Sequence, residues 1–217
     1  MMSSMINASG GISRFAKNDD HEFFSALILA GQLRLAHTHS DRICFQTTYL
    51  NEKYIEYFQM KGNHKLIWML RNPHSVVYSM CYNWGHYALI ELFEGCGLVN
   101  ANQVDRFRYR VFGRRGVNRF RMACHAYVGK VAQLLELNAR LAEPAFVVDY
   151  DQLTQRSHTI LPEVYEYLDL VYQDQYAAQV HKHSVAKSAE LSPEQARLVD
   201  RICGPVYRSA LELVSHA

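Results

Sequence analysis

The chain has 217 residues, of which 49% are apolar, enough to bury the core of one domain. Its formal net charge of +2 indicates no particular charged partner. The five cysteines are scattered and never spaced Cys-x-x-Cys, a pattern typical of reduced thiols rather than of a disulfide framework or a zinc site. No signal peptide and no apolar run of membrane-spanning length is present. We therefore expect a single cytoplasmic domain over residues 1–217.

The first part of the chain predicts short elements. A helix end is expected at residues 1–12, a helix at 19–35, a strand at 43–45 and a second helix at 51–60. His37 and His39 have no third ligand at a suitable spacing, so no metal site is predicted.

Residues 66–70 form a continuous apolar run that is too short for a helix and predicts a strand buried on both faces, as in parallel sheets. Arg71 ends the run, Pro73 suits the first position of a helix, and helical spacing continues to Trp84. Ligands of open parallel sheets bind at the carboxyl ends of strands, against helix N-termini. Arg71 and Ser79 are therefore candidates to bind one anion. The alternative is that Arg71 only caps the strand and Ser79 only faces solvent.

The most basic stretch is residues 105–121, where seven arginines alternate with aromatic residues. Arginines with aromatics suit phosphate or sulfate groups and stacked rings. The alternative is two amphipathic helix ends with a solvated arginine face, joined at residues 113–116. Because the rest of the chain is not basic, no nucleic-acid partner is expected.

Helical spacing over residues 120–141 predicts a long helix, and residues 145–148 predict a second buried strand. Tyr150 follows that strand, and a further helix is expected over residues 160–168.

The last part combines a basic loop at residues 181–187 with a helix. Ser192, Pro193 and Gln195 have the order of a capping box with proline at the first helical position. Residues 204–205, Gly-Pro, are expected to kink this helix.

The strand, the Arg-Asn-Pro turn and the helix that carries Ser79 resemble the 3′-phosphate-binding motif of the sulfotransferases, which use 3′-phosphoadenosine 5′-phosphosulfate as sulfuryl donor. The resemblance implies that Arg71 and Ser79 bind the 3′-phosphate of this donor and that no metal takes part. Residues 145–170 resemble the family's segment with a Tyr-Glu-Asp-Leu turn. In some members that Tyr contacts the adenine, so Tyr150 is a candidate; the alternative is a Tyr that fixes the turn through its hydroxyl.

The loop at residues 181–187 is similar to the family's basic loop that closes over the 3′-phosphate, which implies that Lys182, Ser184 and Lys187 bind the donor. The resemblance implies an α/β fold of the P-loop nucleotide-kinase type, a parallel sheet flanked by helices. The alternation of apolar strands with helices favours an α/β fold independently.

The sequence also departs from the family. It contains no Ser-Gly-Thr-Thr or Gly-x-x-x-x-Gly-Lys loop, so we expect the fold to be N-terminally incomplete, beginning after the 5′-phosphosulfate loop. Preorganised donors of this kind are usually the largest electrostatic contribution to group transfer. Lys17 stands where some members carry a Glu base, and Gln46 stands where the family has Lys. No catalytic base is assigned.

Two functions follow from these observations. The first is a sulfotransferase that moves a sulfuryl group to a hydroxyl or amine of a small molecule or glycan. The alternative is a non-catalytic relative that binds a nucleotide, or a polyanion or RNA through the arginine-rich stretch. The sequence assigns neither the acceptor nor the oligomeric state.

Overall fold

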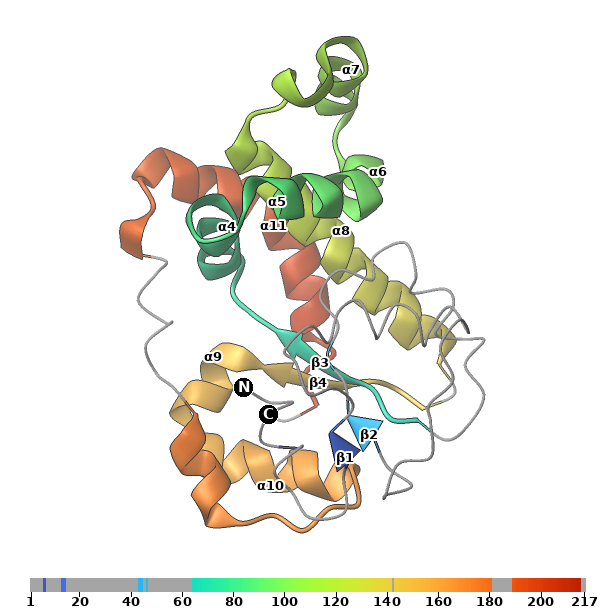
Figure 1. The fold of residues 1–217 in the computed structure, drawn as a ribbon, viewed down its shortest axis with the longest axis vertical. Helices are drawn as coiled ribbons and strands as arrows, with labels where there is room; N and C mark the ends of the chain where they lie inside the picture. Colours follow the sequence, from blue (N-terminus) through green and yellow to red (C-terminus); the bar gives the residue numbers. More distant parts are fainter. Residues whose placement is uncertain are drawn as a thin grey trace. The chain divides into compact units, whose positions relative to one another are not determined.

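The computed structural model describes residues 6, 13–14, 43–44, 46, 64–141, 143–180 and 189–215 (Figure 1). The chain divides into two compact units. The first unit comprises Met1–Lys65 and Arg156–Val180, and the second comprises Leu66–Gln155 and His181–Ala217. The helices expected over residues 19–35 and 51–60 lie outside the described residues, and the single domain stays a prediction.

The first unit contains a short parallel strand pair and a tyrosine cluster. Its elements are β1 (Ser13–Arg14), β2 (Ile43–Cys44), helix α10 (Ser157–Tyr167) and the 3₁₀ helix η3 (Asp174–Gln179). β1 and β2 pair in parallel, which confirms the strand expected at residues 43–45. The buried rings of Tyr165 and Tyr176 stack with their centroids 5.1 Å apart, so η3 packs on α10 through aromatic rings.

The second unit is built on a parallel pair of strands, β3 (Ile67–Leu70) and β4 (Phe146–Asp149). Both arise from the continuous apolar runs that predicted them. The register pairs Ile67 with Phe146 and Leu70 with Asp149, so the two strands end at the same level. On its other side β4 forms a parallel bridge from Val147 to Val214 near the end of the chain.

The remaining elements of this unit are helical. They are α4 (Pro73–Tyr82), α5 (His86–Leu92), the π-helix η1 (Phe93–Gly97), α6 (Leu98–Asn100), α7 (Gln103–Phe112), the 3₁₀ helix η2 (Gly113–Arg115), α8 (Arg119–Arg140), α9 (Tyr150–Gln155) and α11 (Pro193–Leu211). The long helix α8 packs against α11, η1 and α4 and forms the centre of the core (Figure 1). α7 lies at the end of this unit farthest from the β3–β4 pair (Figure 1).

Local sequence signals set the ends of these helices. The Asn72 side chain caps α4, whose first residue is Pro73, as the sequence predicts. Ser192 and Gln195 form the predicted capping box of α11, and this helix continues through Pro205. The predicted extent of α4 to Trp84 is wrong, because the amides of Asn83 and Trp84 both turn back to the carbonyl of Ser79 and close the helix at Tyr82.

The part of the chain that the structure describes is therefore α/β, mostly helical, with two parallel two-stranded sheets. The α/β prediction is confirmed at this level, whereas the larger P-loop-type sheet stays a prediction. All five cysteines carry free thiols. Within the described ranges, no helix is long and apolar enough to cross a membrane.

Candidate functional site

The candidate site lies where β3 and β4 end. Because Leu70 pairs with Asp149 in a parallel register, the next residues of the two strands, Arg71 and Tyr150, leave the sheet side by side. The Arg71 guanidinium lies over the Tyr150 ring, with Cζ 4.8 Å from the ring centroid. This is a cation–π contact that restrains the position of the guanidinium.

The backbone of Arg71 is held as well. The hydroxyl of Tyr127, on α8, donates a hydrogen bond of 2.9 Å to the carbonyl oxygen of Arg71. Burial, more than any neighbouring charge, raises the pKa of Tyr127 far above its ordinary value, so this phenol stays protonated and remains a donor. Arg71 is thus fixed at its backbone by α8 and at its side chain by Tyr150.

Helix α4 begins two residues after Arg71, with Asn72 as its N-cap. Asn72 accepts a 2.9 Å hydrogen bond from the amide of His74 through its side chain, and its own amide donates to Asp151 at 3.2 Å. The His74 ring lies 3.0 Å from the Asp200 carboxylate of α11. The start of α4 is therefore tied to both α9 and α11.

Ser79 lies six residues after Pro73, which corresponds to a rise of about 9 Å along α4. Its side chain is half-buried, and its hydroxyl oxygen lies 3.5 Å from the side-chain amide of Asn83, at the limit of a hydrogen bond. A hydroxyl that accepts a hydrogen bond keeps its proton to donate to an anion.

Two carboxyl groups follow the end of β4 near the site, and one of them, Asp151, interacts electrostatically with Arg71. Asp149 accepts from the amides of Asp151 and Gln152 and so caps α9. Burial raises the pKa of Asp151, and the charge of Asp149 adds to this rise, while the Asn72 amide and Arg71 oppose it. Asp151 accepts the amide of Asn72, the N-cap of α4, so this amide is already engaged within the protein.

Of the predicted donor-binding residues, the structure brings Arg71 and Tyr150 into contact and puts Ser79 on the helix that begins beside them. Lys182, Ser184 and Lys187 lie outside the described residues. Sequence reasoning missed Tyr127 and Asp151 as neighbours of Arg71. Tyr127 shows only helical core spacing in the sequence, so nothing local distinguishes it from a packing residue.

A second polar cluster lies at the base of α7. Asp105 is fully buried, and its Oδ2 lies 2.5 Å from Arg121 Nη2 and 2.7 Å from His125 Nε2. The side-chain amide of Asn102, the residue that caps α7, donates to the same carboxylate at 2.9 Å. A single buried anion therefore joins α7 to two residues of α8.

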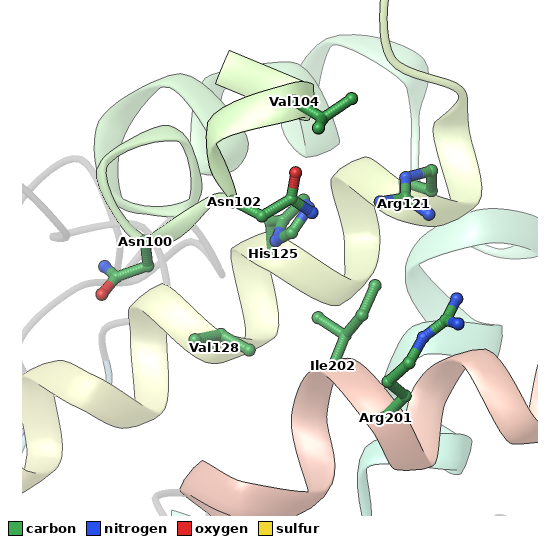
Figure 2. A pocket seen from close by; sticks show the side chains of 8 residues that line it. All are labelled: Asn100, Asn102, Val104, Arg121, His125, Val128, Arg201 and Ile202. Atoms are coloured by element: carbon green, nitrogen blue, oxygen red, sulfur yellow. The ribbon is translucent and has the colours of Figure 1, made fainter. Parts of the chain in front are cut away.

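An open cavity of about 520 Å³ is lined in part by Asn102, Arg121 and His125 of this cluster. Figure 2 shows the side chains that line it. Its lining comes from α6, the α6–α7 connection, α7, α8 and α11, namely Asn100, Asn102, Val104, Arg121, His125, Val128, Arg201 and Ile202. His125 and Tyr127 are two residues apart on α8, about 200° around the helix, so the cavity and Arg71 lie on opposite faces of α8. The polar side chains of this cluster bond mainly to one another, which indicates that the cluster holds α7 against α8.

The Asp105 cluster leads to a pH-dependence. Burial opposes ionisation of Asp105, but the hydrogen bonds from Arg121 and His125 outweigh it and lower the pKa below the ordinary 3.8. A lowered folded-state pKa adds stability that is present above the ordinary pKa and disappears as pH falls through the lowered one. We expect the unfolding free-energy difference between the wild type and Asp105→Asn, measured by urea unfolding, to shrink as pH falls below about 4. A difference that did not shrink in acid would contradict a lowered pKa.

Among the described residues, no group of three or more His, Cys, Asp or Glu is arranged to hold a metal ion. 

No protein-family model and no curated protein matches the chain. Among solved structures, it is similar to one described as the sulfotransferase domain from the curacin biosynthetic pathway, with 14% sequence identity and a TM-score of 0.47. The match covers 83% of this chain and 64% of that structure, so the chain spans slightly under two thirds of its length. A likeness this distant assigns neither family nor activity.

Proposed function

We propose that the chain is a sulfotransferase-like protein that binds 3′-phosphoadenosine 5′-phosphosulfate through the 3′-phosphate, at the carboxyl end of β3. The observation that carries the proposal is the position of Arg71. It follows a strand end at a helix N-terminus, stacks on Tyr150 and is held through its backbone by Tyr127. A pre-oriented guanidinium loses little freedom on binding and matches phosphate oxygens with two parallel N–H groups.

In this proposal Arg71 and Ser79 bind the 3′-phosphate, and the positive end of the α4 dipole favours the anion. Lys182, Ser184 and Lys187 would complete the site, as the resemblance implies.

The resemblance implies that Tyr150 contacts the adenine, and the contact of Tyr150 with Arg71 adds a second role. One face of its ring lies against the Arg71 guanidinium. We therefore assign Tyr150 as a positioning residue for Arg71. Its ring is what matters for this role, so Tyr150→Phe should retain nucleotide affinity and Tyr150→Ala should weaken it.

The donor would supply a sulfuryl group to an acceptor hydroxyl or amine. The acceptor atom forms a bond to sulfur as the bond from sulfur to the 5′-phosphate oxygen breaks, the acceptor proton goes to a base, and 3′-phosphoadenosine 5′-phosphate leaves. No described residue is assigned as that base. Nucleotide binding without sulfuryl transfer would identify a non-catalytic relative of the enzymes.

The test is calorimetric titration with 3′-phosphoadenosine 5′-phosphate and, in parallel, with 5′-adenosine monophosphate. We expect binding that requires the 3′-phosphate. Because a hydrogen bond to a charged group contributes about 1.5–3 kcal/mol, Arg71→Ala should weaken it by about ten- to a hundredfold. The control Arg140→Ala removes an exposed arginine that pairs with Glu136 on its own helix and should leave the affinity unchanged. Equal binding of both nucleotides, or unchanged affinity in Arg71→Ala, would overturn the proposal.

A further inference from the structure

Helix α7 exposes an apolar stripe to solvent. Val104, Phe107 and Val111 follow the spacing i, i+3, i+7 and therefore lie on one face of the helix. Their exposed fractions are 57%, 65% and 52%, and Phe112 at the end of the helix is 63% exposed. Single exposed apolar residues are ordinary, whereas a continuous stripe on one short helix marks a binding surface.

Arginines border this stripe on both sides. At 100° per residue, Arg108 lies on one side of it and Arg110 and Arg106 lie on the other. All three are exposed. The only acidic residue of α7, Asp105, is buried and neutralised by Arg121, so the exposed surface of α7 carries positive charge alone.

Other arginines of this stretch are engaged within the protein. Arg114 pairs with Glu94, and Arg119 donates to the carbonyl oxygens of Met80 and Trp84. Arg121 pairs with Asp105. The expected alternative of a solvated arginine face therefore applies to α7, whereas these three arginines have structural partners.

The opposite side of α7 is anchored, so the stripe is presented on a preformed helix. Asp105 binds Arg121 and His125, and the Tyr109 hydroxyl donates to Glu94. The Tyr109 ring also packs edge-on against Phe93 with the centroids 5.4 Å apart. The helix ends at Gly113, whose φ of 58° is in the left-handed region that favours glycine.

We propose that α7 docks the protein on an anionic lipid surface. The apolar stripe would enter the boundary between headgroups and acyl chains, and the bordering arginines would contact the lipid phosphates. The positive charge of α7 complements an anionic surface. The apolar stripe adds a contact with the acyl chains, which a purely electrostatic partner would not use. An RNA backbone would use the arginines and stack bases on Phe107, but it has no contact that gains from exposing Val104 and Val111. The valines therefore favour lipid over nucleic acid.

The test is sedimentation of the full chain with vesicles of phosphatidylcholine alone and of phosphatidylcholine mixed with phosphatidylserine. We expect binding only to the mixed vesicles, weakening as salt is raised. Two variants separate the contributions: Val104→Ser/Phe107→Ser/Val111→Ser removes the stripe, and Arg106→Gln/Arg108→Gln/Arg110→Gln removes the charge. Each should lower vesicle binding by roughly tenfold or more.

The matched control is Tyr87→Ser, which removes an aromatic side chain that is 80% exposed on α5 and should leave binding unchanged. Circular dichroism of each variant checks that the fold is retained. Three results would overturn the proposal: no binding to mixed vesicles, binding that depends on the arginines but not on the stripe and is displaced by single-stranded RNA, or a wild-type dimer that the stripe variant dissociates. The second result would identify a polyanion site and the third a contact between two copies of the chain.

Discussion

Replacing Asp105 with Ala is expected to lower the free energy of unfolding by about 3–5 kcal/mol. The carboxylate is fully buried and is the shared acceptor of Arg121 and His125. Alanine would leave a largely buried guanidinium without its anion and would remove the link between α7 and α8. Urea unfolding at neutral pH measures the change.

The matched control is Glu136→Ala, which breaks an exposed i,i+4 ion pair with Arg140. Exposed pairs of this kind contribute about 0.3–0.5 kcal/mol, so this variant should unfold almost as the wild type does. If the two variants were equally stable, the buried cluster would contribute no more than a surface pair, and the structural role given to it would be wrong.

The second large effect is expected for Gly129→Ala. Gly129 lies where α8 crosses the π-helix η1, and a Cβ at this position would lie 2.3 Å from the carbonyl oxygen of Cys96. A backbone atom cannot rotate away as a side chain can, so the two helices would have to separate. Overpacking of this kind costs about 1–3 kcal/mol, and occasionally more. For a chain of this size each kcal/mol shifts Tm by about 2–4 °C, which calorimetry resolves.

Gly204→Ala provides the comparison. It also lies inside a helix, α11, but the nearest atom to its added Cβ is Arg208 Nη1 at 3.3 Å, the far end of a flexible side chain. Alanine favours a helix by about 1 kcal/mol over glycine, but a Cβ on the residue before Pro205 crowds the proline ring. The two effects oppose each other, so this variant should be close to neutral. A Gly129→Ala protein with the same Tm as Gly204→Ala would mean that α8 and η1 have room to adjust.

The sequence was sufficient for elements whose signals are local. The apolar run before Arg71, the Asn72–Pro73 turn and the Ser192 capping box each depend on a few adjacent residues, and the structure has all three as predicted. The end of α4 was not predicted. The amides of Asn83 and Trp84 both bond to the carbonyl of Ser79, and no residue type in this segment signals that pattern.

The site was predictable only in part. Arg71 and Tyr150 were separate candidates, and their contact follows from the pairing of Leu70 with Asp149, which are distant in sequence. The Asp105–His125 contact is of the same kind, because it depends on how α7 folds back onto α8. Long-range partner choice is decided by packing of the whole unit, which no local pattern specifies.

The bridge between Val147 and the end of the chain also has a consequence for solubility. The Val147 amide donates to the Ser215 hydroxyl at 2.9 Å, and its carbonyl accepts the Ser215 amide at 3.0 Å. With β3 on its other side, β4 therefore has both of its hydrogen-bonding edges occupied at this residue. An open edge is the usual template on which a second chain adds a strand and aggregation starts. Val214 and Ser215 thus shield β4 at Val147 from intermolecular pairing.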